Sequence, residues 1–357
     1  MKIAPENDFE FNQSLPSVLM TGITGFIGMH TARRIVKKYN ITALVRPGTR
    51  KSRYVEFESD VRIVELNLSD KVELQNYLEK RKFDYILHIG ALRGGRAFNV
   101  NEFLKTNVIA TEVLLNNALK NKSKLIFCSS VGVFGAIPVE LPANEHTPFQ
   151  EDNLYHKTKI QCERMIQKAV LDKGLKAYIV RPAITYGKYD YGFPYTLTKL
   201  IDKKLLFLPH NKIFIHLTNV EALAEAFNKI LENDYPSGKV WTVADCEKVN
   251  FAELVNFVHE RITENRKIIK NSKSNQKNSV NIKFKPYPAS RLIKKEFFVF
   301  MTKVAKFFRS ELWTSRFELI SNSWYYDVRQ SYEDLKLKQY KTIPDFKVVI
   351  DWYLGKK

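Results

Sequence analysis

Cysteine is scarce in this chain of 357 residues, and long apolar runs are absent. The three cysteines, Cys128, Cys162 and Cys246, are scattered without metal-ligand spacing, which argues against a disulfide scaffold and a metal site. No apolar run reaches the ~18 residues of a membrane-spanning helix, and the N-terminus lacks the apolar core of a signal peptide. Together with 45% apolar residues, these absences predict a folded, cytoplasmic protein.

Acidic residues are also few relative to basic ones. The chain has 57 Lys and Arg against 38 Asp and Glu, a formal net charge of +19. Residues 261–357 alone carry 22 Lys and Arg against 9 Asp and Glu, a net charge of +13. Such an excess suits an anionic substrate, nucleic acid or a membrane surface, and a solvated Lys-rich face is the plainer interpretation.

Strand-like and helical patterns alternate along the first half of the chain. Short runs rich in Val and Ile, typical of buried strands, are separated by amphipathic helical segments. This alternation predicts an α/β fold, a Rossmann-type doubly wound parallel sheet in the order 3-2-1-4-5-6 that starts at Ser17. We assign residues 16–182 to this nucleotide-binding domain, with 216–246 returning to it. Residues 183–215 and 247–357 are assigned to a smaller, discontinuous C-terminal substrate-binding lobe.

The first strand-like run leads into a glycine-rich turn, within "VLMTGITGFIGMHTARRIV" (18–36). Gly22, Gly25 and Gly28 are three residues apart, and the turn opens an amphipathic helix. Glycines there allow a tight turn, a close approach of the backbone to a pyrophosphate and close helix–strand packing. The helix N-terminus then presents free N–H groups and a positive dipole end to the anion. The segment therefore predicts a dinucleotide pyrophosphate at residues 22–28.

The segment after the second strand, "ALVRPGTRKSR", is basic. An acidic residue at this place binds the ribose 2′-hydroxyl of NAD, whereas an arginine accommodates the 2′-phosphate of NADP. Here Arg46 comes first, Arg50, Lys51 and Arg53 follow, and the next acid is Glu56. The pattern favours NADP over NAD, with solvated loop cations as the alternative.

Three polar residues further along fit acid–base chemistry. Tyr155 and Lys159 in "NLYHKTK" are four residues apart, so we expect them on one face of a helix. A tyrosine hydroxyl is a weak acid, and a nearby ammonium group favours its ionised form. Ser130, at the end of the fifth strand in "SSVGVFG", can hydrogen-bond the reacting oxygen. These three residues predict a general acid/base site.

Taken in order, these motifs resemble the extended short-chain dehydrogenase/reductases, the NAD-dependent epimerase/dehydratase superfamily. "TGITGFIG" (21–28), "FDYILHIGA" (83–91), "SSVGVFG" (129–135) and "VRPAITYG" (180–187) match its landmarks, and the resemblance covers about residues 16–245. It implies that Ser130, Tyr155 and Lys159 are catalytic. It also implies cofactor contacts at Gly22, Thr24, Gly25, Phe26, Ile27, Gly28, Arg46, Asn67, Leu68, Gly90, Ala91, Asn107, Tyr155 and Lys159.

Two departures from the family pattern bear on the substrate. The nucleotide-sugar epimerases of the family usually have Asn where this chain has Ile184, and their second phosphate-binding arginine has no clear counterpart here. Together with Arg46, this favours the branch of 3β-hydroxysteroid dehydrogenases and NADP-dependent carbonyl reductases. Arg93 and Lys212 are the expected substrate-binding residues.

The first hypothesis is therefore an NAD(P)-dependent oxidoreductase that transfers a hydride between nicotinamide and a secondary alcohol or ketone. The alternative is a nucleotide-sugar 4-epimerase or dehydratase with retained NAD. A second alternative is a non-catalytic dinucleotide sensor, which an intact Ser-Tyr-Lys set argues against. We expect a homodimer, paired through helices at 101–121 and 153–173 as in this family, and no nucleic-acid partner.

The segment "RLIKKEFFVFMTKVAKFFRSELW" (291–313) mixes cations with aromatic residues. A basic amphipathic helix with aromatics can lie on an anionic membrane. More often such a stripe belongs to a core or to the wall of a substrate pocket. Core packing is the favoured interpretation, and contact with a membrane surface is the alternative.

Overall fold

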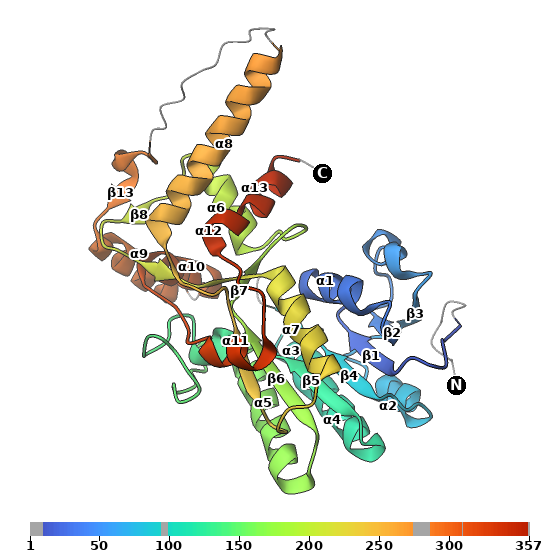
Figure 1. Ribbon diagram of the computed structural model, residues 1–357. Helices are drawn as coiled ribbons and strands as arrows, with labels where there is room; N and C mark the ends of the chain where they lie inside the picture. The colour runs from blue at the N-terminus through green and yellow to red at the C-terminus, as the bar shows by residue number, and fades with distance from the viewer. Residues whose placement is uncertain (1–9, 94–98, 274–285, 309, 356–357) are drawn as a thin grey trace.

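A parallel sheet forms the centre of the computed structural model, which describes residues 10–93, 99–273, 286–308 and 310–355 (Figure 1). Its seven strands run in the order β11-β6-β5-β4-β1-β2-β3. The expected order 3-2-1-4-5-6 is confirmed, and β11 extends it beside β6 after the chain has returned to the sheet. The strands are β1 (Ser17–Thr21), β2 (Asn40–Val45), β3 (Val61–Glu65), β4 (Tyr85–His88), β5 (Lys124–Cys128), β6 (Ala177–Pro182) and β11 (Val240–Val243).

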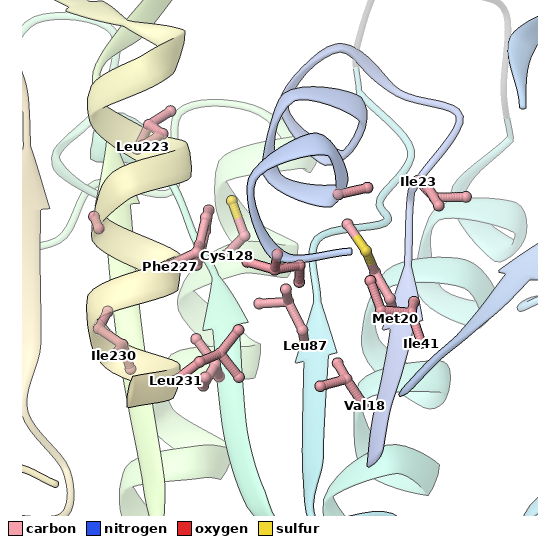
Figure 2. Close-up of a cluster of buried hydrophobic side chains, with 14 of the residues drawn as sticks. Val18, Met20, Ile23, Ile41, Leu87, Cys128, Leu223, Phe227, Ile230 and Leu231 are labelled. Atoms are coloured by element: carbon pink, nitrogen blue, oxygen red, sulfur yellow. The ribbon is translucent and has the colours of Figure 1, made fainter. Parts of the chain in front are cut away.

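Helices cover both faces of this sheet, as the alternation predicted. On one face α1 (Phe26–Ile35) and α7 (Val220–Glu232) pack side by side. The other face carries α2 (Lys71–Glu79), α4 (Ala110–Asn121) and α5 (Leu154–Lys173). Successive strand residues point to opposite faces, so in β1 Val18 and Met20 enter the first core and Leu19 the second. Figure 2 shows the first core, where Leu223, Phe227, Ile230 and Leu231 of α7 point toward Cys128 and Leu87, and Met20 lies further along the same cluster beside Ile23 and Ile41.

The helix expected over residues 101–121 is divided into three parts. A short helix α3 (Val100–Phe103) leads into the π-helical turn η3 (Leu104–Ile109), and α4 follows. A π turn inserts one extra residue per turn, so it rotates the side chains on either side of it relative to a regular helix. Asn107 lies within this turn.

The C-terminal region is mostly helical and shares a third core with the loops at the carboxyl edge of the sheet. Val131 and Phe134 from those loops pack in one cluster with Leu197, Val255 and Trp324. The elements here are β7 (Ile184–Tyr186), α6 (Phe193–Asp202), β8 (Leu208–Pro209), β9 (Phe214–Ile215), β10 (Leu217–Asn219), β12 (Val249–Asn250), α8 (Phe251–Lys273), β13 (Leu292–Ile293), α9 (Lys295–Phe307), α10 (Glu311–Ser321), α11 (Arg329–Leu335), α12 (Thr342–Asp345) and α13 (Lys347–Tyr353). Within the described residues, no helix combines the length and apolar character needed to cross a bilayer.

Asp245 joins three parts of the chain that are distant in sequence. Its buried carboxylate accepts hydrogen bonds from the Tyr186 hydroxyl (2.8 Å), the Asn219 backbone N–H (2.8 Å) and the Thr342 hydroxyl (2.5 Å). Burial raises the pKa of Asp245 to about 6. The last of these donors comes from α12, so the end of the described chain completes a buried polar cluster beside β11.

Candidate active site

The glycine-rich turn between β1 and α1 is shaped by close backbone contacts. Gly22 has a φ of +82°, and a Cβ there would lie 2.6 Å from the backbone nitrogen of Gly90. A Cβ on Gly28 would lie 2.0 Å from the carbonyl oxygen of Gly22, whereas one on Gly25 would meet that oxygen at 3.2 Å. A glycine is therefore needed at Gly22 because the backbone there has a positive φ, and at Gly28 because the helix packs closely on the preceding turn.

The first turn of α1 is open to an anion. Its N-cap residue is Gly25, no side chain caps it, and no acidic residue lies in the turn. The free backbone N–H groups and the positive end of the helix dipole are therefore left for a negatively charged ligand. Phe26 and Ile27, two of the expected cofactor contacts, supply the first of these N–H groups.

A cavity of about 540 Å³ lies beside this turn, at the carboxyl edge of β1, β2, β3 and β4. Seven of the expected cofactor-binding residues line it together: Gly22, Thr24, Arg46, Asn67, Leu68, Gly90 and Ala91. The sequence reasoning missed Leu92 and Thr106, which also line it. Neither belongs to a motif, and their only signal is that they adjoin Ala91 and Asn107 in the chain.

The cations after β2 have different surroundings. Arg46, Arg50 and Arg53 line the cavity, and none of them makes an ion pair within the part of the chain that the structure describes. Lys51 instead pairs with Glu58 at 3.1 Å. Glu56, the first acid after the strand, is bound by Arg33 at 2.8 Å. The positive charge at the cavity is therefore carried by three arginines.

A chain of buried hydrogen bonds lies beneath the glycine turn. The hydroxyl of Thr21 contacts the backbone N–H of Gly90 (2.9 Å) and Nδ1 of His88 (2.7 Å). Nε2 of His88 contacts the hydroxyl of Thr111 at 3.0 Å. Burial lowers the pKa of His88 to about 3, so the ring stays neutral at physiological pH. This series of hydrogen bonds links β1, β4 and α4 and adds no charge under the cavity.

Asn107, an expected cofactor contact, is engaged with the protein itself. Its side-chain amide accepts from the Leu92 N–H (2.8 Å) and donates to the Leu92 carbonyl (3.0 Å) and the Thr158 hydroxyl (3.1 Å). The residue is 2% exposed. Asn107 thereby attaches the loop after β4 to α5 at Thr158, and its contact with a cofactor stays a prediction.

The three residues expected to be catalytic come from the turn after β5 and from the first two turns of α5. Nζ of Lys159, which is 2% exposed, donates to the carbonyl oxygen of Cys128 at 2.7 Å, the last residue of the strand. The same ammonium group lies 5.9 Å from the centre of the Tyr155 ring. Ser130 follows two residues after Cys128, and its Oγ accepts the Gly132 N–H at 3.0 Å. The spacing of four between Tyr155 and Lys159 does place both on α5.

An aspartate–histidine pair, which the sequence reasoning missed, flanks Tyr155. Nδ1 of His156 lies 2.5 Å from Oδ1 of Asp152. The other side of the ring packs on Gly132, where a Cβ would come within 2.3 Å of it. His156 therefore fixes the start of α5 against the turn that contains Ser130. The only sequence signal for it is the spacing of four between an acid and a histidine.

The two expected substrate-binding residues lie in different places. Lys212 is exposed in the loop between β8 and β9 and does not line the cavity. Arg93 follows the cavity residue Leu92 and lies close enough to Asp190 to lower the pKa of its carboxyl. Burial of Asp190 has the larger effect, so the pKa of its carboxyl is raised overall. Its Oδ2 has no hydrogen-bond partner among the described residues. Substrate binding by Arg93 and Lys212 stays a prediction.

Replacing Gly28 with alanine tests the packing of the glycine turn. The new Cβ would overlap the Gly22 carbonyl oxygen, which is backbone, so α1 must move away from β1. We expect the free energy of unfolding to fall by about 1–3 kcal/mol, as for other overpacked sites. Gly25→Ala, with its nearest contact at 3.2 Å, is the control and should cost clearly less. Urea unfolding followed by circular dichroism measures both, and equal losses would contradict the packing role of Gly28.

The chain belongs to the NAD dependent epimerase/dehydratase family, whose model matches residues 18–244. That range contains the glycine turn, the cavity and the residues at the end of β5. The family includes dehydrogenases, dehydratases and epimerases among the relatives of this chain. The expected resemblance is confirmed at the level of the family.

Among curated relatives, a sterol-4-alpha-carboxylate 3-dehydrogenase (decarboxylating) of Candida albicans is 30% identical over 188 residues, 50% of this chain and 53% of that enzyme. A dTDP-D-glucose 4,6-dehydratase of Bos taurus is 26% identical over 286 residues, 74% of this chain and 76% of the enzyme. The first match thus spans about half the length of the relative.

Two solved structures share the fold over nearly their whole length. The crystal structure of gox2253 has a TM-score of 0.73 at 20% identity and covers 95% of this chain and 98% of its own. The UDP-glucuronic acid 4-epimerase of Bacillus cereus, in complex with NAD, has a TM-score of 0.68 at 16% identity and covers 96% and 100%. Both likenesses confirm the Rossmann-type fold.

Proposed function

We propose that this protein is an NAD(P)-dependent oxidoreductase that interconverts a secondary alcohol and a ketone, with Tyr155 as the proton donor and acceptor. The observation that carries the proposal is the position of Lys159. Its buried ammonium group is fixed by the last carbonyl of β5 and lies beside the Tyr155 ring. A tyrosine hydroxyl with a fixed ammonium group nearby is an arrangement that suits a general acid/base. None of the three catalytic candidates lines the cavity at the glycine turn.

The residues beside the glycine turn fit a dinucleotide. The turn has no room for side chains at Gly22 and Gly28, α1 offers an uncapped N-terminus, and the cavity continues to the end of β2. Gly22, Thr24 and Gly25 would hold the pyrophosphate, Arg46 the adenine ribose, and Asn67 and Leu68 the adenine. When bound, the nicotinamide supplies the hydride acceptor or donor.

The hydrogen bonds of the protein leave the required donors available. The Oγ of Ser130 already accepts from Gly132, so its own hydrogen remains to bind the substrate oxygen. Lys159 uses one N–H on Cys128 and keeps two for a ribose hydroxyl and the Tyr155 oxygen. Ser130 orients the oxygen, Tyr155 transfers the proton, and Lys159 holds the ribose and the tyrosine hydroxyl in position.

A second candidate is a nucleotide-sugar epimerase or dehydratase that retains its cofactor. It is favoured by the dTDP-D-glucose 4,6-dehydratase relatives, which match a larger share of this chain than the sterol dehydrogenase does. The content of bound dinucleotide in the purified protein distinguishes the two. An oxidoreductase that exchanges cofactor is expected to purify largely without it and to need added cofactor. One equivalent of bound NAD, with turnover of a nucleotide sugar and no added cofactor, would establish the second candidate instead.

We further propose that NADP is preferred over NAD. Arg46 and two further arginines line the cavity without an acidic partner there, and a guanidinium group binds a phosphate through paired hydrogen bonds. We expect NADPH to bind about 10- to 150-fold more tightly than NADH, which corresponds to roughly 1.5–3 kcal/mol for one charge-assisted contact.

Arg46→Asp should reverse this order, because the carboxylate repels the 2′-phosphate and can accept the 2′-hydroxyl of NADH. Titration of both cofactors by intrinsic fluorescence measures the change. Lys51→Asp is the control, since Lys51 pairs with Glu58 and does not line the cavity. Equal affinities in the wild type would show that the loop cations only face solvent, and the retained-NAD candidate would then gain support.

A further inference from the structure

Helix α9 carries two separate apolar faces. Phe298 and Ala305, seven residues apart, are buried on the face that packs toward α10. Phe297, Phe300 and Phe307 follow a spacing of three and seven, which places them on a different face of the helix. Together with Phe308, which caps the helix, they form what we call the aromatic face.

The aromatic face is exposed to solvent. Phe297 is 45% exposed, Phe300 61%, Phe307 81% and Phe308 73%. Core packing, the interpretation favoured by the sequence, is therefore correct for one side of α9 and wrong for this one. Single exposed apolar residues are ordinary, but a helix face of four phenylalanines marks an interaction surface.

Cations border the aromatic face. Lys303 is exposed between Phe300 and Phe307, and Lys295 is exposed at the start of α9; neither makes an ion pair within the described ranges. Glu296, four residues before Phe300, is an exposed acid on the same side. Lys306 pairs with Glu318 of α10 at 2.8 Å. At the start of α10, Trp313 is 51% exposed, and the guanidinium carbon of Arg316 lies 5.2 Å from the centre of its ring. Apolar aromatics are thus combined with positive charge over both helices.

We propose that α9 and the start of α10 dock on an anionic lipid bilayer, with the aromatic face in the interface and the lysines on the lipid headgroups. The charge decides between a bilayer and a second copy of the chain. Two copies meeting through this face would bring the same cations together, whereas an anionic headgroup layer complements them. Exposed phenylalanine and tryptophan beside lysine is the composition of helices that lie in the interface plane.

Vesicle co-sedimentation tests the proposal with the full-length protein. We expect binding to vesicles of phosphatidylglycerol and phosphatidylcholine, and much weaker binding to pure phosphatidylcholine or at high salt. The double variant Phe300→Ser/Phe307→Ser should lower the partition coefficient at least ~10-fold, since two aromatic side chains that would enter the bilayer interface are lost. Lys295→Glu/Lys303→Glu should abolish the preference for the anionic lipid.

A matched control is available on α5. Leu171 is 82% exposed, close to the value for Phe307, and lies near the end of α5 rather than on α9 or α10, so Leu171→Ser should leave vesicle binding unchanged. Trp313 provides a direct signal, because its emission should shift to the blue on binding and the shift should vanish in Trp313→Phe. Circular dichroism confirms that each variant is folded.

Two outcomes would overturn the proposal. One is equal binding of the wild type and Phe300→Ser/Phe307→Ser to anionic vesicles. The other is no vesicle binding at all, together with a dimer that the same double variant converts to a monomer in light scattering. The latter would assign the aromatic face to contact between two copies of the chain.

Discussion

We expect Tyr155→Phe to lower turnover at least ~10²-fold while cofactor affinity changes little. The substitution removes the hydroxyl proposed to exchange a proton with the substrate oxygen and keeps the ring beside the Lys159 ammonium group. We expect proton transfer to be slow without it, because Ser130 can hydrogen-bond the substrate oxygen but is not proposed to transfer the proton. Steady-state rates with a panel of ketones and nucleotide sugars, combined with cofactor titration by fluorescence, separate turnover from binding.

Tyr39→Phe is the control for this variant. Tyr39 immediately precedes β2, at the amino edge of the sheet, so its hydroxyl is far from the carboxyl edge where the cavity lies. Its rate should match the wild type. Retention of full activity by Tyr155→Phe would remove Tyr155 from the mechanism, whichever substrate is used.

We expect Glu163→Gln to lower the free energy of unfolding far more than the loss of an ordinary surface salt bridge would. Glu163 lies one turn after Lys159 on α5 and binds Arg181 of β6, with N–O distances of 3.0 and 2.6 Å. The side chains are 2% and 7% exposed. Removing one charge leaves the other buried and unpaired, which costs about 3–5 kcal/mol, or roughly 10²- to 10⁴-fold in the folding equilibrium.

The matched control is Glu56→Gln. Glu56 binds Arg33 at 2.8 Å, but the side chains are 42% and 34% exposed, so its loss should cost at most about 1 kcal/mol. Urea unfolding of both variants measures the difference. If the two losses were equal, the Glu163–Arg181 pair would contribute no more than a surface contact. α5 would then be positioned against β6 by its apolar residues alone.

The glycine turn and the alternation of strands and helices were predictable because their signals are local, and the strand order is the usual one for a doubly wound sheet of this kind. Gly22 and Gly28 leave no space for a side chain, and strand-like runs between helices can connect only through crossovers of one hand. The spacing of Tyr155 and Lys159 is likewise a property of any helix. Each of these inferences needs only a short window of sequence.

Features that depend on distant contacts were not predictable. Nothing in the sequence around Asn107 shows that its amide is used by Leu92 and Thr158 or that the helix contains a π turn. Periodicity predicted that α9 is amphipathic. The sequence alone does not show whether its second apolar face packs in a core or faces solvent. The exposure of Phe300 and Phe307 therefore required the tertiary structure.

The cluster at Asp245 has a consequence for how the chain is made. During synthesis β11 and its neighbours leave the ribosome long before Thr342, so the carboxylate at first lacks one of its three donors. The Trp241 indole N–H likewise lacks its acceptor until Asp334, to which it donates at 2.8 Å, has been made. Domains usually fold in the order of their synthesis. This sheet can complete the hydrogen bonds at its edge only when the segment at 329–345 has emerged from the ribosome.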